Sequence, residues 1–273
     1  MILVTGGCGF IGSHLVAKLV ELGHDVRVLD DFSTGKKENL EGLKNIEIME
    51  GDVRSTQDCL RAMQDCDTVF HLAALTDARE SGDKMFQVNF IGSKNIFAAS
   101  KGKVIFTSSA SVYGEGNAKE DSPLVPKSDY GKSKAKAERL AKDGFIVRLF
   151  NVYGPRGNSV INKFSKNICA EKEITLYGNG MQTRDYVHVN DVVDALLLGL
   201  EHEGTYNVGT GKETPLLNAV SMIEKIYDEK AKMKFEMPKE GELQRSKADI
   251  SKITELGWEP KVSLEDGIKD LVK

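Results

Sequence analysis

Short apolar runs alternate along the chain with longer amphipathic stretches. Each apolar run is four to six residues long and rich in Val, Ile, Leu or Phe, and most of the stretches between the runs are long enough to hold a helix. Near-continuous apolar strands separated by helices are typical of a parallel sheet buried on both faces. The pattern predicts strands at 1–4, 26–30, 46–49, 68–71, 104–107 and 145–150. It predicts helices at 10–22, 86–100, 129–142 and 192–201.

The pattern changes after about residue 150. Loops then mix with a predicted helix near 159–171, a short strand at 205–208, and helices after Pro215 and around Ser263. We therefore predict an α/β fold with two domains. The first is a doubly wound parallel sheet over residues 1–152. The second, over 153–273, is a smaller, partly interleaved substrate-binding domain, and some of its segments return to the first domain.

Composition narrows the class of protein. With 40% hydrophobic and 29% charged residues and a mean hydropathy of −0.30, the chain is typical of a globular cytoplasmic protein without membrane spans. The 37 basic and 41 acidic residues are intermixed and leave a net charge of −4, which does not favour nucleic-acid binding. The four cysteines have no C-x-x-C or metal-binding spacing, which predicts free thiols and no metal site. The apolar run at the N-terminus is too short for a signal peptide.

A glycine-rich turn follows the first predicted strand and precedes the first predicted helix. The turn reads T-G-G-C-G-F-I-G, with Gly6, Gly9 and Gly12 three residues apart. Glycines in this context let the backbone approach a pyrophosphate and direct N–H groups of the helix N-terminus at it. The next strand ends in Asp30 and Asp31, where a carboxylate can accept ribose hydroxyls and repel a 2′-phosphate. The combination predicts a Rossmann-type NAD site.

Two further loops follow predicted strands, at the edge where open parallel sheets bind ligands. One is G-D-V around Asp52, whose carboxylate can reach an adenine amino group. The other is H-L-A-A, in which the small Ala73 and Ala74 let a cofactor lie against the backbone. His71 opens this second loop and is interpreted as a packed structural residue.

A tyrosine and a lysine lie four residues apart at the start of a predicted helix. Tyr130 and Lys134 thus share one helix face, where the ammonium can favour the ionised phenol. A tyrosine titrates near about 10, so it needs this neighbour and a cationic nicotinamide to act as a base at neutral pH. Ser109, in the S-S-A-S-V-Y-G loop after the fifth strand, can bind the same substrate hydroxyl. We predict these three residues to be catalytic.

Together these motifs resemble those of the extended short-chain dehydrogenase/reductases. The glycine turn, the acidic strand end, H-L-A-A, the serine loop and Y-x-x-x-K are similar to those of the NAD-dependent epimerase/dehydratase group, which acts on nucleotide sugars. L-F-N-V-Y-G-P at 149–155 resembles the substrate loop of that group, and Q-x-R-D-Y-V-H at 182–188 resembles its phosphate-binding arginine segment. A-D-I-S-K and L-G-W-E-P, further along, are also similar. The resemblance covers nearly the whole chain.

Positions beside Ser109 distinguish the members of this group. Sugar 4,6-dehydratases have an Asp-Glu pair where this chain has Ala110 and Ser111, and related decarboxylases usually have a glutamate at the position of Ser111. The chain most resembles the UDP-glucose 4-epimerases. This resemblance implies NAD-dependent 4-epimerisation of a UDP-hexose through a 4-keto intermediate.

The resemblance also implies roles for individual residues. Tyr130 would remove the proton of the sugar 4-hydroxyl, Lys134 would tune Tyr130 and bind the nicotinamide ribose, and Ser109 would orient the hydroxyl. Phe150 would flank the nicotinamide. The expected NAD contacts are Gly6, Gly9, Phe10, Ile11, Gly12, Asp30, Asp31, Thr34, Gly35, Asp52, Val53, Leu72, Ala73, Ala74, Tyr130, Lys134 and Phe150. The expected substrate contacts are Ser81, Ser109, Asn151, Arg184 and Arg245.

The chain departs from the family pattern in three places. The segment at 81–89, the turn at 100–103 and the end of the Tyr130 helix at 142–144 are shortened. In the family, the Tyr130 helix and the helix ending near Ser100 usually form a homodimer contact, so trimming at their ends leaves a homodimer open. Lys239 and Arg245 both lie near the position of a family arginine, and either could contact the diphosphate. Ser246 stands where epimerases restricted to unmodified hexoses have a tyrosine. A serine there leaves room for an N-acetyl group, so N-acetylhexosamine substrates stay open.

Two other functions stay open. A nucleotide-sugar dehydrogenase or reductase would use the same residues and release NADH, whereas an epimerase never needs to release its cofactor. A catalytically silent NAD-binding sensor would use the same sheet, although such proteins commonly lose the tyrosine or the lysine. The sequence does not identify the sugar or the nucleotide base.

Overall fold

The chain folds into two compact units. The computed structural model describes residues 1–76, 82–141, 143–238 and 243–272. Unit 1 comprises Met1–Tyr113, Leu124–Arg148 and Val193–Tyr206, and unit 2 comprises Gly114–Pro123, Leu149–Val192 and Asn207–Lys273. Unit 2 thus takes a segment from well before residue 150, and a segment beyond residue 190 belongs to unit 1.

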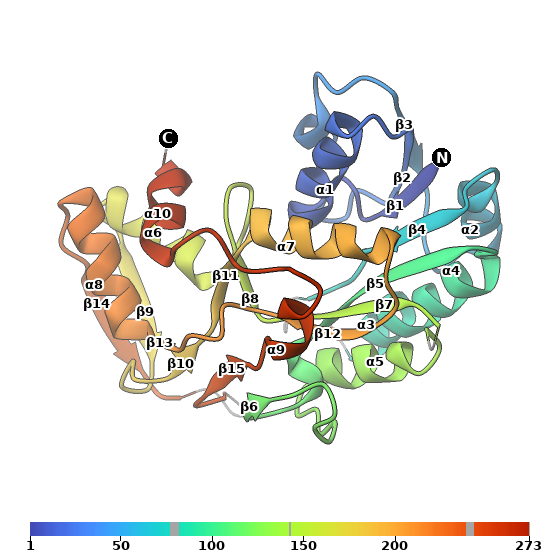
Figure 1. The fold of residues 1–273 in the computed structure, drawn as a ribbon. Coiled ribbons are helices and arrows are strands. Elements are labelled where there is room, and N and C mark those ends of the chain that lie inside the picture. The colour runs from blue at the N-terminus through green and yellow to red at the C-terminus, as the bar shows by residue number, and fades with distance from the viewer. Residues whose placement is uncertain (77–81, 142, 239–242, 273) are drawn as a thin grey trace. The chain divides into compact units, whose positions relative to one another are not determined.

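The core of unit 1 is a seven-stranded sheet with strand order β3-β2-β1-β4-β5-β7-β12 (Figure 1). The pairings from β3 through β5 are parallel. The strand order reverses between β1 and β4, which is the switch point where open parallel sheets bind ligands. The strands are β1 Ile2–Thr5, β2 Val26–Asp30, β3 Ile46–Glu50, β4 Thr68–His71, β5 Lys103–Ser109, β7 Phe145–Leu149 and β12 Gly204–Val208. The predicted fold class is confirmed.

Helices connect these strands. They are α1 Phe10–Glu21, α2 Thr56–Met63, α3 Gly82–Phe86, α4 Ser93–Ala99, α5 Asp129–Glu138 and α7 Val189–Leu197, of which α7 extends from unit 2 into unit 1. A π-helical segment, Gln87–Gly92, joins α3 to α4, so the single helix predicted at 86–100 is longer and interrupted. Short 3-10 turns lie at Lys37–Leu40, Ala110–Val112 and Leu198–Leu200. Helix α5 ends before residue 142 because the N–H groups of Leu140 and Ala141 bond to carbonyls three residues back.

Apolar strands of unit 1 are buried along their whole length. Every residue of β1, β4 and β7 is buried, as a sheet covered on both faces requires. Leu3, Val69 and Ile96 are fully buried in one cluster, which packs β1, β4 and α4 together. The sheet therefore supplies a rigid base for the loops at its edge.

Unit 2 contains short paired strands and helices. Its strands are β6 Gly116–Ala118, β8 Asn151–Tyr153, β9 Glu173–Tyr177, β10 Thr183–Arg184, β11 Tyr186–His188, β13 Thr214–Pro215, β14 Lys232–Glu236 and β15 Ser246–Ala248. They pair as β10-β13, β8-β11, β9-β14 and β6-β15. Its helices are α6 Val160–Cys169, α8 Leu216–Tyr227, α9 Ser251–Thr254 and α10 Leu264–Lys269, followed by a 3-10 turn at Asp270–Val272.

The core of unit 2 packs α6, α8 and α10 against β8 and β9. Tyr153, Ile161, Leu176 and Ile223 are all fully buried there. A buried carboxylate, Asp191, accepts hydrogen bonds from the backbone N–H groups of residues 261 and 262 at 3.0 and 3.1 Å. All four cysteines are free thiols. Over the described ranges, the helices are too short or too polar to cross a bilayer.

Candidate active site and cofactor pocket

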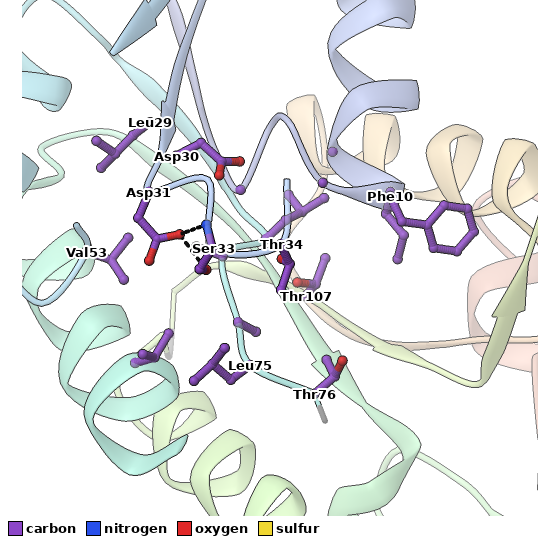
Figure 2. Close-up of a pocket in the computed structure, with 18 of the residues that line it drawn as sticks. Phe10, Leu29, Asp30, Asp31, Ser33, Thr34, Val53, Leu75, Thr76 and Thr107 are labelled. Carbon is purple, nitrogen blue, oxygen red and sulfur yellow. Dashed lines mark hydrogen bonds between the residues drawn. The ribbon is translucent and has the colours of Figure 1, made fainter. Parts of the chain in front are cut away.

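A cavity opens at the C-terminal ends of β1, β2 and β4 (Figure 2). Most of the predicted NAD contacts line it, namely Gly6, Gly9, Phe10, Ile11, Gly12, Asp30, Asp31, Thr34, Val53, Leu72, Ala73 and Ala74. Its lining also includes residues that we did not predict, namely Leu29, Ser33, Gly51, Leu75, Thr76, Val88 and Thr107. Most of these are sequence neighbours of predicted residues. Gly35, Asp52, Tyr130 and Lys134 are outside the lining, and Phe150 belongs to unit 2.

The glycine turn is packed so closely that side chains would not fit. Gly6 has φ of +68°, and a Cβ there would lie 2.8 Å from the backbone nitrogen of Ala73. A Cβ at Gly12 would lie 2.1 Å from the carbonyl oxygen of Gly6. The turn thus brings its backbone to the cavity wall at the start of α1, which is the arrangement that holds a pyrophosphate. The residues present fit NAD.

The two acids at the end of β2 play different parts. Asp30 is buried, and its Oδ2 and Oδ1 accept the backbone N–H groups of Cys8 and Phe32, each at 2.9 Å. Burial raises the pKa of Asp30, although these two hydrogen bonds oppose that shift. Asp31 is exposed and accepts both the N–H and the hydroxyl of Ser33 (Figure 2). Asp30 therefore also fixes the glycine turn, and both carboxylates remain on the cavity wall.

The carboxylate of Asp52 is already held by another residue. Arg54 donates to it from Nε at 2.8 Å, and this guanidinium lowers the pKa of Asp52. Its neighbours Gly51 and Val53 line the cavity. The predicted contact from Asp52 to adenine stays a prediction.

Lys134 is buried directly behind the cofactor cavity. Its Nζ donates to the carbonyl oxygen of Thr107 at 2.9 Å and lies 4.8 Å from the ring centre of Phe106. Thr107 itself lines the cavity. Only 1% of Lys134 is exposed, and burial lowers the pKa of its ammonium to about 7 while Glu138 opposes that shift. The lysine is therefore near its midpoint at neutral pH.

Tyr130 retains its proton in this arrangement. Burial raises the pKa of Tyr130 to about 12, although its hydrogen bond with Ser109 lowers it in part. The ammonium of Lys134 donates to the carbonyl oxygen of Thr107, and the predicted favouring of the phenolate by Lys134 stays a prediction. Ser109 is buried at the end of β5, and its hydroxyl accepts the N–H of Ser111 at 3.1 Å. The structure thus brings Ser109 to Tyr130, as predicted.

A glycine places α5 against the serine loop. Ser128 begins the helix, because its hydroxyl accepts the N–H of Gly131 at 3.1 Å. A Cβ at Gly131 would lie 2.3 Å from the carbonyl oxygen of Ser111. Only a residue without a side chain allows the helix this close to the loop that carries Ser109. Sequence reasoning missed Gly131, although it lies inside the Y-x-x-x-K motif.

Asn89 was also missed and connects two parts of the site. In the π-helical segment, its Oδ1 accepts the N–H of Leu75 at 2.8 Å and its Nδ2 donates to the carbonyl of Leu75 at 2.9 Å. Its Nδ2 also donates to the hydroxyl of Ser133 on α5 at 3.1 Å. Ser133 in turn donates to the carbonyl of Tyr130 at 2.7 Å. One amide therefore joins the cavity wall to α5, the helix that carries Tyr130 and Lys134.

His71 is structural, as predicted. Its Nδ1 is 2.6 Å from the hydroxyl of Thr5, and its Nε2 is 2.9 Å from that of Ser93. The ring stacks on Phe106 at 5.6 Å. Complete burial lowers the pKa of His71 to about 3, so the imidazole is neutral.

Of the predicted substrate contacts, Ser109 lies in unit 1, whereas Asn151, Arg184 and Arg245 lie in unit 2. Arg245 donates to Glu213 from Nε at 3.0 Å and from Nη2 at 2.6 Å. Arg184 donates to the carbonyl of Thr183, whose hydroxyl bonds the same Glu213 at 2.8 Å. Asn151 pairs with Tyr186 between β8 and β11, and Ser246 is buried in β15. Ser81 and Lys239 lie outside the described residues. Within the described ranges, no three His, Cys, Asp or Glu side chains gather as a metal site requires.

The fold and the site define a class of protein. A doubly wound parallel sheet carries a glycine turn and paired acids at its switch point. The buried Lys134 bonds to Thr107 on the cavity wall, and Ser109 bonds to Tyr130 on the same helix as Lys134. This is the architecture of a Rossmann-fold enzyme that uses a dinucleotide cofactor.

Comparison with known proteins identifies the family. Residues 2–209 match the model of the NAD dependent epimerase/dehydratase family, and the chain belongs to that family. The UDP-glucose 4-epimerase of Mycolicibacterium smegmatis is 36% identical, in an alignment covering 99% of this chain and 97% of the relative. The UDP-glucuronic acid decarboxylase 1 of Arabidopsis thaliana is 33% identical over 99% of this chain and 68% of the relative.

A solved structure agrees with this assignment. The Thermus thermophilus UDP-glucose 4-epimerase in complex with NAD superposes with a TM-score of 0.94 at 33% identity, covering 99% of this chain and 97% of that one. The predicted family, the class of NAD-dependent epimerase and NAD as cofactor are confirmed.

Proposed function

We propose that the protein catalyses NAD-dependent 4-epimerisation of a UDP-hexose. The observation that carries this proposal is the position of Thr107, which lines the cofactor cavity and accepts the ammonium of Lys134 at 2.9 Å. Through Thr107, the proposed catalytic set, which consists of Ser109, Tyr130 and Lys134, would adjoin the place where a nicotinamide ring binds. The UDP-glucose 4-epimerases among the relatives support the choice of reaction.

Bound NAD would supply a reversible hydride acceptor for C4 of the sugar. Tyr130 would accept the proton of the 4-hydroxyl and return it, because it is half-buried and bonded to Ser109. Ser109 would hold the hydroxyl in line for that transfer. The residues alone keep Tyr130 protonated, so the positive charge of the nicotinamide and that of Lys134 are both needed to bring its pKa toward neutrality.

The nucleotide end of the substrate would bind to unit 2. Arg184 and Arg245 carry guanidinium groups that match phosphate oxygens, and Asn151 follows the strand that leads from unit 1. Arg245 would exchange Glu213 for the diphosphate. Ser246, with its small side chain, would leave room for an N-acetyl group, so we propose unmodified and N-acetylated hexoses as alternative substrates.

The test is proton NMR of the purified protein without added NAD. Separate samples contain UDP-galactose, UDP-N-acetylglucosamine and UDP-glucuronic acid, each repeated with Tyr130→Phe. Conversion of either of the first two to its C4 epimer, lost in the variant, supports the proposal and selects the sugar. Conversion of the uronic acid alone, or loss of its carboxyl group, assigns the protein to another reaction of the family.

A second measurement separates an epimerase from a dehydrogenase. An epimerase regenerates NAD in place, so we expect NAD to co-purify with the protein and no NADH to accumulate at 340 nm. Stoichiometric release of NADH during turnover would favour a nucleotide-sugar dehydrogenase instead. Failure to convert any of the three sugars, with NAD present, would contradict the proposal.

A further inference from the structure

A buried ion pair lies beside the catalytic set in unit 1. Arg148, near the end of β7, donates to Glu138 of α5 from Nε to Oε1 at 3.0 Å and from Nη2 to Oε2 at 2.8 Å. The two side chains are only 7% and 6% exposed. A bidentate pair in this setting has both a fixed distance and a fixed orientation. The carboxylate of Glu138 is therefore held in one place.

The guanidinium of Arg148 also binds the serine loop. Its Nη1 donates to the hydroxyl of Tyr113 at 2.7 Å, and its central carbon lies 4.8 Å from the Tyr113 ring centre. Tyr113 closes the turn after Ser109, since its N–H bonds to the carbonyl of Ala110. One cation thus joins β7, α5 and the serine loop.

Glu138 lies one helical turn beyond Lys134. Side chains four residues apart share a helix face, and both of these are buried. The ammonium of Lys134 otherwise faces the ring of Phe106 and the carbonyl of Thr107 on β5, and His71 on β4. None of these three carries a negative charge, and Tyr130, on the same helix, retains its proton.

We propose that Glu138 is a positioning residue for the reaction: held in place by Arg148, its carboxylate is the counter-charge that keeps Lys134 an ammonium inside a buried site. The consequence for turnover rests on the proposed function, whereas the effect on the charge of Lys134 does not. Glu138 would touch neither substrate nor cofactor, and would act through the lysine alone. Arg148 has a supporting role, because its two hydrogen bonds prevent the carboxylate from turning away.

The direct test is a carbon-13 NMR titration of the lysine ε-carbons in the NAD-free protein. The resonance of Lys134 is identified by its loss in Lys134→Met. The pKa of Lys134 is about 7 in the unaltered protein. Removing a buried charge one turn away should lower the midpoint by about one pH unit in Glu138→Gln. Glu138→Asp retains the charge, and its midpoint should stay within about half a unit of the original.

A double variant keeps the test decisive if Glu138→Gln does not fold. Glu138→Met with Arg148→Met removes both charges and retains side-chain volume, an exchange that proteins commonly tolerate. The midpoint of Lys134 should fall in this variant too. Asp191→Asn, which alters a buried carboxylate of unit 2, controls for general loss of stability and should leave the midpoint unchanged. A midpoint that stays near 7 in folded Glu138→Gln or in the double variant would overturn the proposal.

The second readout is the pH profile of turnover with the sugar identified above. With its midpoint one unit lower, Lys134 would be about one-tenth protonated at pH 7 instead of one-half, so kcat should fall about fivefold there. The alkaline limb of the profile should move down by the same amount as the NMR midpoint. A shift in the NMR midpoint without conversion of any sugar would retain the role of Glu138 and refute the proposed function. Conversion with an unmoved alkaline limb would refute the role in turnover.

Discussion

Two arginine–glutamate pairs in this protein share their chemistry and differ in their surroundings. In unit 1, the side chains of Arg148 and Glu138 are 7% and 6% exposed. In unit 2, those of Arg245 and Glu213 are 59% and 18% exposed. Both guanidinium groups bind the carboxylate through two nitrogen atoms. Geometry alone therefore does not tell what each pair does.

The difference in exposure separates a fixed pair from an exchangeable one. Water competes for both partners at the surface, so an exposed pair adds little stability and its arginine can bind another anion. A buried pair that loses one partner leaves an unpaired charge away from water. We infer that Arg148 holds the architecture of the catalytic set, whereas Arg245 is available to a phosphate.

The largest effect should follow from breaking the buried pair. Arg148→Ala leaves Glu138 buried and unpaired, and we expect it to lower the free energy of unfolding by about 3–5 kcal/mol. Urea denaturation followed by circular dichroism measures this change. The double change of Glu138 and Arg148 to Met should recover most of the loss. A single variant as stable as the unaltered protein would remove the distinction between the two pairs.

The pH dependence of stability should show the buried charge of Lys134. Its pKa in the folded protein is about 7, against an ordinary value of 10.5, so between these values the unfolded chain binds more protons. The contribution of Lys134 to the free energy of unfolding therefore rises with pH, by about 1.5 kcal/mol from pH 7 to 8.5. We expect the unaltered protein to gain this amount relative to Lys134→Met. Arg245→Ala serves as control and should not alter the pH dependence.

A smaller effect, on binding rather than folding, is expected from the exposed pair. Arg245→Ala removes a guanidinium that we propose for the diphosphate, and should raise KM for the UDP-sugar about tenfold with kcat within twofold. Steady-state kinetics measure both constants. An unchanged KM would assign Arg245 to the surface pair alone and leave Arg184 as the phosphate ligand.

The smallest effect should come from the acidic partner of the exposed pair. Glu213→Gln removes the charge that Arg245 binds, and we expect the thermal unfolding midpoint to stay within about 3 °C of the original. Differential scanning calorimetry measures it. A fall much larger than this would show that Glu213 and Arg245 stabilise unit 2 as strongly as the buried pair stabilises unit 1.

The sequence predicted the cofactor side of the site better than its supports. The glycine turn and Asp30 can be recognised in the sequence, because their spacing is local and each position needs a particular residue type. Asn89 and Gly131 do not, because their roles depend on contacts with Leu75 and Ser111, which are distant along the chain. Hydrophobic periodicity also could not predict the π-helical segment, since one extra residue in a turn hardly alters the apolar pattern.

The sequence did contain a reason to doubt that the carboxylate of Asp52 is available to adenine. Arg54 follows Asp52 by two residues, close enough for the guanidinium to return to the carboxylate. The buried pair of Glu138 and Arg148 was not predictable in this way, because a helix and a later strand must first pack together. Sequence patterns therefore do not predict ion pairs such as this one, whose partners come together only in the folded protein.

The side-chain amide of Asn89 imitates a piece of backbone. It offers Leu75 one acceptor and one donor, at 2.8 and 2.9 Å, just as a neighbouring strand would. The peptide of Leu75 is thereby paired as if the sheet continued beyond β4, although no strand lies there among the described residues. Its amide hydrogen should exchange with water as slowly as those of a central strand. This wall of the cavity is consequently pre-shaped, and ligand binding need not order it.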